Sequence, residues 1–350
     1  MGSRWSFTTF CKELFAVAGL FLVVGFNFSA NADALMLSIG VGRVDPAHYG
    51  TNVATLTGPE HDAIDARSFI ANWPTNQPKK SFGLLLNEKA TRTNVIGILD
   101  DVATRLNSND LFVVYFSGHG GEIPDPHADA TNGMDQTWCL FDGELLDKEL
   151  YAEWAKFPAG VRIVLISDSC HSAGISKLAF DAADQIVNAI NADVLDDAKF
   201  NVGGDVRSSI RAAENSRLEF QDTEHCNVKS LAPQDALLVY SKNRDFYREL
   251  LANLQFTNAP IQTKVLSISA CGDNQFAADA GVFRNSIFTR ALLSCWKGGA
   301  YKGSYVLFVK SVRTLASAMN SDQTVAARMI DTNDPAFWHQ RPFTFLPPNP

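Results

Sequence analysis

Two short apolar runs limit the folds open to this chain, because each stops abruptly in small and polar residues. The first reads LFVVYFSGHGG at 111–121 and the second reads VRIVLISDSCHSAG at 161–174. A run that is apolar throughout is typical of a strand buried on both faces, as in a parallel sheet. Functional sites of such sheets lie beyond the carboxyl ends of the strands, which makes His119 and Cys170 candidate site residues.

The rest of the chain repeats an alternation of apolar runs and helical patterns, which predicts an α/β fold with a mainly parallel sheet and helices on both faces. The expected strands lie at 35–42, 82–88, 111–116, 161–167 and 263–272, and the expected helices at 59–73, 91–106, 146–157 and 285–297. The polar stretch 175–262, with helical spacing over 235–254, interrupts the alternation. We interpret it as a long insertion after the Cys170 strand, within a single domain at 33–350.

Composition and charge exclude one class of partner. The chain has 350 residues, 46% of them hydrophobic and 19% charged, with a formal net charge of -8. This composition is globular, and no basic patch is visible that could neutralise phosphates. We therefore expect no nucleic-acid partner.

The N-terminus has the pattern of a secretory signal peptide. Arg4 and Lys12 precede the apolar run LFAVAGLFLVVGF, and the small-residue sequence SANADA follows it. We predict a signal peptide at 1–32, a secreted or periplasmic location, and no stable membrane association after cleavage. The alternative is an uncleaved anchor, because the uncharged stretch 14–32 is near the lower limit for a membrane span.

Removal of this leader leaves five cysteines, and an odd number outside the cytosol means that at least one thiol stays unpaired. They are Cys139, Cys170, Cys226, Cys271 and Cys295. The disulfide connectivity stays open. No C-x-x-C motif is present, so the sequence indicates no metal site built on cysteine.

Cys170 and His119 together have the chemistry of a nucleophile and its general base. A thiol at a strand-to-loop turn can be activated by a nearby imidazole. The N–H groups of Gly120 and Cys170 could form an oxyanion hole. The alternative is a buried structural cysteine beside an incidental loop histidine. A serine hydrolase is excluded because the chain has no G-x-S-x-G elbow. A Rossmann-type cofactor enzyme is excluded because no G-x-G-x-x-G follows the first strand.

The segments SGHGG and DSCHSAG resemble the paired signatures of the caspase-like cysteine peptidases, above all the bacterial metacaspases. Cys170 follows His119 by 51 positions, a separation that suits this family. LTGPEHDA at 56–63, LSISACGDNQFAAD at 266–279 and the closing FWHQRPF are also similar to family segments. The resemblance covers most of 35–175 and 263–346, and leaves out the insertion.

The resemblance implies a role for each matching position. His119 and Cys170 fall on the catalytic dyad, and Asp62, Ser117 and Asp168 fall where metacaspases line the pocket for the residue before the cut bond. Two carboxylates and a hydroxyl suit a cationic side chain, and bidentate pairing favours Arg. The implied function is an endopeptidase that cuts peptide or protein substrates after Arg or Lys. The alternative is an inactive caspase-like binding or regulatory module.

The resemblance also raises the question of calcium, which activates many metacaspases through acidic loop residues. Asp147 matches one such position, but Lys148 occupies the neighbouring one and Lys177 replaces another acid. We therefore predict no metal and no cofactor, and we expect any control to come from the insertion. The alternative is that the insertion is only a solvated decoration of the sheet. Its possible cleavage targets are Lys177, Arg207, Arg211 and Arg217. The oligomeric state and the physiological substrate stay open.

Overall fold

The structure is a computed structural model that describes most of the chain outside its N-terminus and the stretch after Cys170. The described residues are 32–71, 79–125, 133–170, 215, 218, 227–254, 261–272, 275–281, 283–331 and 334–344. The predicted signal peptide therefore lies outside the described residues except for Ala32. The four cleavage targets expected in the insertion and Cys226 lie outside them as well.

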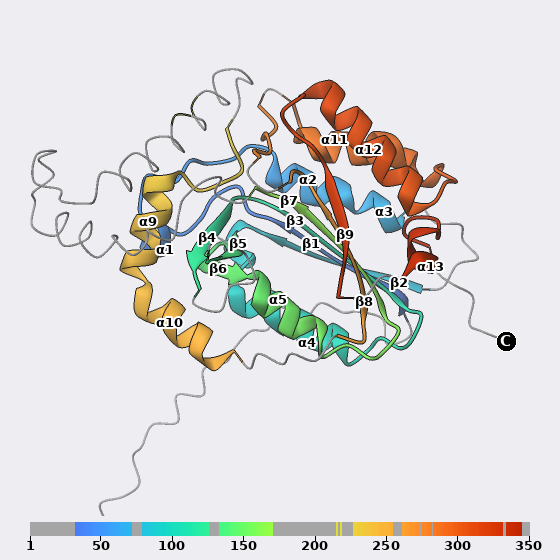
Figure 1. The fold of residues 1–350 in the computed structure, drawn as a ribbon, viewed down its shortest axis with the longest axis horizontal. Coiled ribbons are helices and arrows are strands. Elements are labelled where there is room, and N and C mark those ends of the chain that lie inside the picture. The colour runs from blue at the N-terminus through green and yellow to red at the C-terminus, as the bar shows by residue number, and fades with distance from the viewer. Residues whose placement is uncertain are drawn as a thin grey trace, which may run out of the picture.

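A six-stranded sheet forms the centre of the molecule, in the order β2-β1-β3-β7-β8-β9 (Figure 1). The first five strands are parallel and β9 is an antiparallel edge strand. The predicted α/β class with a mainly parallel sheet is confirmed. The strands are β1 (Ala32–Gly40), β2 (Lys79–Leu86), β3 (Leu111–Ser117), β7 (Arg162–Asp168), β8 (Lys264–Ser269) and β9 (Ala326–Ile330).

Helices cover both faces of this sheet (Figure 1). One face carries α2 (Pro59–Ala66), α3 (Ser68–Ala71), α11 (Ile287–Trp296) and α12 (Tyr305–Met319), and the other carries α4 (Arg92–Ala103) and α5 (Asp147–Trp154). Four short helices lie in the connections between these elements: α1 (Pro46–Tyr49), η1 (Asn87–Lys89), η2 (Lys297–Gly299) and α13 (Pro335–Trp338).

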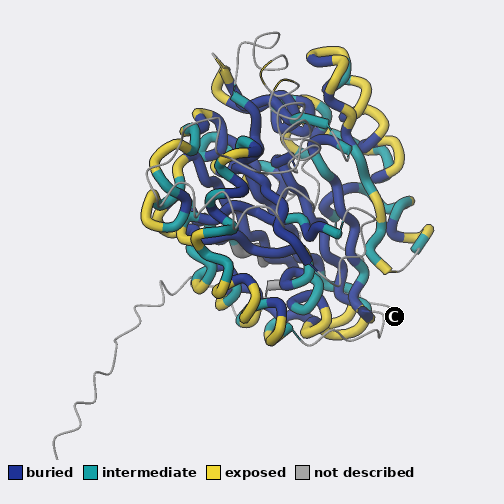
Figure 2. The backbone as a smooth tube through the Cα atoms, turned by 60° about the vertical axis from the view of Figure 1, so that its left-hand side comes forward, coloured by how far each residue is buried: buried dark blue, intermediate teal, exposed yellow. Residues whose placement is uncertain are grey.

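Successive side chains of each strand point to opposite faces, so both faces need apolar residues. In β3, Val113 and Tyr115 join the hydrophobic core on the α2 and α11 side, whereas Phe112 and Val114 join the core on the α4 side. Figure 2 shows the result as a buried centre whose surrounding helices expose only their outer sides. The continuous apolar pattern of the strands follows from this double burial.

Two expectations were incomplete. The helix expected at 59–73 is divided at Arg67 into α2 and α3. The segment between His119 and α5, for which no strand was expected, holds a small antiparallel sheet of β4 (Gly120–Pro124), β5 (Met134–Leu140) and β6 (Gly143–Leu146). These strands bury charged side chains such as Glu122, Asp135 and Glu144, so their sequence lacks the apolar pattern of a buried strand.

The helical pattern at 235–254 is confirmed as two helices, α9 (Pro233–Lys242) and α10 (Arg244–Asn253), which meet at Asn243. They pack beside the small sheet: Leu237 of α9 shares a hydrophobic cluster with Met134, and Leu251 of α10 shares one with Ile123. Among the described helices, none is both long and apolar enough to cross a membrane.

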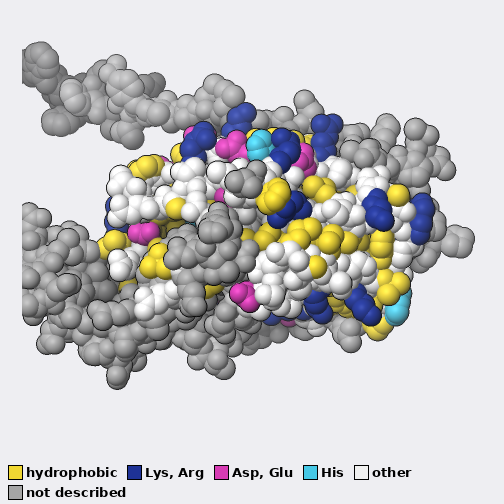
Figure 3. All heavy atoms as spheres, turned by 90° about the horizontal axis from the view of Figure 1, so that it is seen from above, with side chains coloured by type: hydrophobic (Ala, Val, Ile, Leu, Met, Phe, Trp, Pro, Cys, Tyr) yellow, Lys and Arg dark blue, Asp and Glu magenta, His cyan; other side chains and the backbone are white. Residues whose placement is uncertain are grey.

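A hollow of about 600 Å³ lies between α12, β9 and α13, where Val306, Arg313 and Trp338 line it. Figure 3 looks down on the α11 and α12 side of the molecule and shows a band of hydrophobic side chains among scattered Lys and Arg. This hollow is lined by none of the side chains that follow β3 and β7.

Candidate active site

The strands β3 and β7 are hydrogen-bonded neighbours, and this pairing brings the two candidate turns together. Ser117 is paired in register with Asp168, and the N–H of Gly118 donates to the Asp168 carbonyl at 3.3 Å. His119 and Cys170 therefore leave the sheet at the same edge. Both are buried, with 1% and 0% of their surfaces exposed.

Gly120 lets the two turns touch. A Cβ at this position would lie 1.9 Å from the Cys170 carbonyl oxygen, so no residue other than glycine fits without a shift of the backbone. The N–H groups of Gly120 and Cys170 both donate to one oxygen, the Lys229 carbonyl, each at 3.0 Å. Two N–H groups that converge on one carbonyl oxygen have the geometry of an oxyanion hole.

The ring and the thiol of the candidate dyad are each held by backbone groups. His119 Nε2 lies 2.7 Å from the Ala54 carbonyl oxygen. This contact assigns the N–H to Nε2, so that Nδ1 is the proton-accepting nitrogen of the neutral ring. The Cys170 Sγ accepts a hydrogen bond from the Ala277 N–H at 3.0 Å.

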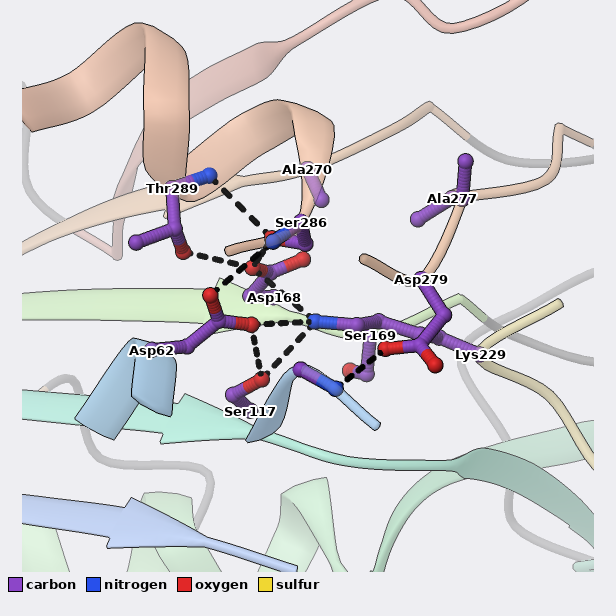
Figure 4. Close-up of polar contacts among 12 residues, drawn as sticks. Asp62, Ser117, Asp168, Ser169, Lys229, Ala270, Ala277, Asp279, Ser286 and Thr289 are labelled. Atoms are coloured by element: carbon purple, nitrogen blue, oxygen red, sulfur yellow. Dashed lines mark hydrogen bonds and ion pairs between the residues drawn. The ribbon is translucent and has the colours of Figure 1, made fainter. Parts of the chain in front are cut away.

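The three predicted pocket residues come from different elements and meet around one ammonium group. Asp62 lies on α2, Ser117 ends β3 and Asp168 ends β7. The Nζ of Lys229 lies 2.9 Å from Asp62 Oδ2, 3.0 Å from Asp168 Oδ2 and 2.8 Å from Ser117 Oγ (Figure 4). Lys229 is fully buried, and its three N–H bonds thus have three acceptors.

Two residues that the sequence analysis did not identify hold the carboxylates in place. The N–H of Ser286 donates to Asp62 Oδ1 at 3.0 Å, and its hydroxyl donates to Asp168 Oδ2. The hydroxyl of Thr289, at the start of α11, donates to the same Asp168 oxygen at 2.7 Å. A polar residue at a helix start is usually only a cap, so no signal in the sequence marks these two as pocket residues.

Burial and charge act against each other in this pocket. Burial raises the pKa of Asp62 to about 6, and the nearby Asp168 adds to the rise, while Lys229 opposes it. Burial alone would lower the pKa of Lys229, but the charges of Asp168 and Asp62 outweigh it and raise the pKa above its ordinary value. The pocket is therefore built for a cation.

Residues 227–231, which we name the cleft segment, run through the site with a bend at Lys229, between isolated β-bridges of Val228 with Ala278 and of Ser230 with Gly120. The Lys229 N–H donates to the Ala277 carbonyl at 3.0 Å, and the Asp279 N–H donates to the Asn227 carbonyl at 2.9 Å. On the other side of the segment, the Leu231 N–H donates to the Gly120 carbonyl at 3.0 Å. Part of the predicted insertion 175–262 therefore lies inside the site.

Asp279 holds the backbone beside the cleft segment in place, and the sequence analysis did not identify it. Its carboxylate accepts hydrogen bonds from the N–H groups of Thr57 at 2.7 Å and Gly58 at 2.9 Å. It thereby ties the backbone that pairs with the cleft segment to the turn that starts α2. As a result, the acidic pocket and the backbone of residues 277–279 are held at a fixed distance from each other.

Comparison with known proteins places this geometry in a family. The family described as Caspase domain matches residues 44–329, which is most of the chain. The chain belongs to the caspase family. The family indicates a cysteine peptidase, and Cys170 supplies one of the two N–H groups that converge on the Lys229 carbonyl.

Similar proteins agree with this assignment. Metacaspase-1 of Schizosaccharomyces pombe is 26% identical over 248 residues, 66% of this chain and 52% of that protein. Metacaspase-4 of Arabidopsis thaliana is 25% identical over 181 residues, 47% of this chain and 43% of that protein. The chain spans about half the length of these curated relatives.

A solved structure supports the caspase-type fold. A protein from Geobacter sulfurreducens superposes with a TM-score of 0.68 at 34% identity, over 90% of this chain and 99% of that one.

At the positions that raised the question of calcium, the structure places the ammonium group of Lys148 among carboxylates. Lys148, on α5, forms an ion pair with the buried Asp125. Burial and a hydrogen bond with Asp147 raise the pKa of the nearby Asp135 to about 10, so Asp135 holds a proton at neutral pH. Among the described residues, no group of three or more His, Cys, Asp and Glu side chains could hold a metal ion. Because the Lys148 ammonium already pairs with Asp125, the described side chains offer a divalent cation fewer free anionic oxygens than it prefers.

We expect calcium to leave the activity unchanged. Peptide turnover measured in EGTA and in millimolar calcium should agree within about twofold, because Lys148 already neutralises the carboxylates that a cation would need. The matched variant Lys148→Gln should unfold at a lower temperature, since it removes the ammonium group that pairs with the buried Asp125 carboxylate. Strong stimulation of the natural chain by calcium would contradict the prediction.

Within the described residues, Cys139, Cys170, Cys271 and Cys295 are free thiols. The predicted presence of at least one unpaired thiol agrees with this, and Cys226 lies outside the described part.

Proposed function

We propose that the protein is an exported cysteine endopeptidase that cuts peptide bonds after Lys or Arg. One observation carries the proposal: a lysine is bound with its carbonyl oxygen on two backbone N–H groups and its ammonium between two carboxylates. The first contact places a scissile carbonyl, and the second selects the side chain before it. The leader-like N-terminus supports export, and the mass of the chain recovered outside the cytoplasm tests it.

The roles of the dyad follow from the contacts of each group. Cys170 would attack the carbonyl carbon, and its own N–H and that of Gly120 would stabilise the negative oxygen that forms. His119, oriented by the Ala54 carbonyl, would take the thiol proton on Nδ1 and give it to the leaving amine. Water would then hydrolyse the thioester.

The pocket can accept both basic side chains. Lysine fills it with a single nitrogen that touches one oxygen from each carboxylate. The other Asp168 oxygen, Oδ1, is buried and has no hydrogen-bond partner among the described residues. A guanidinium, which donates through several nitrogens, could reach this oxygen as well. Arginine would thus be accepted beside lysine.

A fluorogenic peptide library that varies the residue before the cut bond tests the proposal. Lys and Arg peptides should exceed all others in kcat/KM, and Asp peptides should not be cut, because a third carboxylate in this pocket would be buried beside two others. A preference for Asp would overturn the specificity. No turnover of any peptide by a folded chain would favour the alternative of a binding or regulatory module.

A further inference from the structure

We propose that Glu144 is a positioning residue for the oxyanion hole, and that it acts through hydrogen bonds to the small sheet and to helix α10. The inference rests on the proposed function, because the group that it positions is the N–H of Gly120. It goes further by assigning a role in the reaction to a carboxylate that is part of neither the dyad nor the acidic pocket.

The carboxylate of Glu144 lies against the strand that follows His119. Glu144 belongs to β6 and is buried, with 2% of its surface exposed. Its Oε1 accepts a hydrogen bond from the Thr137 hydroxyl of β5 at 2.9 Å. A Cβ at Gly121 of β4 would lie 2.3 Å from the same oxygen, so the absence of a side chain at Gly121 makes room for the carboxylate. One oxygen thus holds β4 and β5 in place relative to each other.

This placement matters because Gly121 follows the residue that supplies an oxyanion N–H. Gly120 and Gly121 pair in register with residues 137–138 of β5. The Gly120 N–H donates to the Lys229 carbonyl at 3.0 Å, within the range that an oxyanion donor needs. A misplacement of about 1 Å in a reacting group can cost about 100-fold in rate. A carboxylate that fixes β4 against β5 therefore fixes this donor.

The second carboxylate oxygen connects the small sheet to the helix pair of the insertion. Oε2 of Glu144 accepts a hydrogen bond from the Tyr247 hydroxyl of α10 at 2.7 Å. The same hydroxyl oxygen lies 2.8 Å from Nε2 of His48 on α1, and the Asn243 amide donates to the His48 carbonyl at 3.1 Å. Figure 1 shows α9 and α10 beside the small sheet, and this chain of polar groups joins α10 to it.

Packing alone does not account for a carboxylate at this place. Burial of a carboxylate costs free energy unless a cation pairs with it. The Arg92 guanidinium binds the Glu149 carboxylate at 2.6 and 2.9 Å and also donates to the main-chain carbonyl of Glu144. Among the residues that the structure describes, the Glu144 carboxylate takes part in no ion pair. An apolar side chain would fill the space at lower cost, so the two accepted hydrogen bonds are what requires a carboxylate.

Glu144 changes its charge near neutral pH. Burial raises its pKa from 4.5 to about 7, while its two hydroxyl donors and the charge of Arg92 oppose the rise. Both oxygens are acceptors in the structure, which is the hydrogen-bonding pattern of the ionised form. A proton on either oxygen would displace one donor. The donor strand β4 should therefore be held best once Glu144 is ionised.

The neighbouring groups do not titrate in the same interval. Burial lowers the pKa of His48 to about 4, so its ring is neutral at neutral pH. The charged groups around that ring are Asp142, Lys242, Arg92 and Asp45. Burial raises the pKa of three neighbours of Glu144, which keep their protons: Tyr49, Cys139 and Tyr247. A titration of this network near neutral pH therefore belongs to Glu144.

Stability and catalysis should respond to this titration in opposite directions. The folded chain holds the Glu144 proton more tightly than the unfolded chain does. The stability that Glu144 contributes is therefore present below pH 4.5 and is lost as the pH rises to about 7. Turnover should instead rise over this interval, because the ionised carboxylate accepts both hydrogen bonds. A residue that acted only on stability would move both measurements in one direction.

Steady-state kinetics of the full chain on a Lys fluorogenic peptide test the proposal. Glu144→Ala should lower kcat by about 10- to 100-fold and leave KM within about twofold, because an oxyanion donor acts in the transition state and not on the bound peptide. Tyr247→Phe keeps the buried ring and should lower kcat by about three- to tenfold through the loss of one hydrogen bond. If Glu144→Ala does not fold, Tyr247→Phe and Glu144→Gln still decide the outcome.

Glu144→Gln separates the charge from the hydrogen bonds. Its amide oxygen can accept one of the two bonds, so it should regain part of the turnover lost in Glu144→Ala. Its profile of kcat against pH should lack the rise near neutral pH that the natural chain shows. His119 titrates in both chains, so the difference between the two profiles is the quantity assigned to Glu144.

Glu153→Gln, on α5, is the control for a buried glutamate outside this network. Burial raises the pKa of Glu153 to about 7 as well, but its partner is Lys156. Both Gln variants should lose part of the natural chain's fall in unfolding temperature as the pH rises. Glu153→Gln should keep the natural kcat and its pH profile.

The failures can be told apart. Natural kcat in folded Glu144→Gln and Tyr247→Phe at every pH would overturn the positioning role and leave the proposed function standing. A kcat that follows the unfolding temperature in all four variants would make Glu144 a structural residue and would overturn the role as well. No turnover in any folded form would overturn both proposals.

Discussion

Purified Cys170→Ala should lose peptide turnover by about 10⁴-fold or more, because removal of a nucleophile leaves only binding and the oxyanion hole to act on the substrate. His119→Ala should cause a loss of similar size, because His119 is the proposed base for the thiol. The measurement is kcat/KM on a Lys fluorogenic peptide, with the circular dichroism spectrum as a check of folding.

Cys295→Ala provides the matched control for the thiol. Cys295 lies on α11 and is half-buried, so its replacement removes a thiol at little cost to the core. This variant should keep the natural activity. Full activity in Cys170→Ala would remove Cys170 from the mechanism and with it the proposed function.

Asp62→Asn should lower kcat/KM for Lys peptides by roughly 30-fold to several thousand-fold. The substitution keeps the size of the side chain and an oxygen for the Ser286 N–H, but it can turn an amide toward the ammonium. Loss of one partner from a buried charge pair costs on the order of 2–5 kcal/mol. The assay is best made in Lys229→Gln protein, in which the chain's own lysine does not compete for the pocket.

Asp65→Asn, one turn further along α2, is the matched control. Asp65 forms an ion pair with Arg284 outside the pocket, and a pair of this exposure contributes little. Its loss should leave kcat/KM close to the natural value. Equal effects of the two substitutions would show that Asp62 acts through the helix and not through the substrate.

The central sheet could be predicted because its strands are buried on both faces, which leaves a continuous apolar signal in the sequence. The small sheet of β4–β6 could not, because its strands bury Glu122, Asp135 and Glu144 among partners that are distant in sequence. Glu144, for example, accepts hydrogen bonds from Thr137 and from Tyr247 of α10. Such pairs are invisible until the chain is folded.

The residues of the candidate site also differ in how far the sequence could predict their positions. Asp168 and Ser117 end neighbouring strands, so a sequence argument could bring them together. No local sequence pattern identifies Lys229 as a site residue, since the surrounding CNVKSLAP resembles an ordinary polar connection. Its place depends on the path of the chain from Cys170 back to the cleft, and no periodicity in the sequence fixes that path.

The buried lysine also has a consequence for the lifetime of the folded protein. Asp62 and Asp168 share one internal counter-ion, the ammonium group of Lys229. A Lys229→Gln chain would hold two close carboxylates without this cation, and their repulsion would lower its resistance to heat. Small basic molecules or substrates that enter the pocket would restore part of that resistance while they are bound.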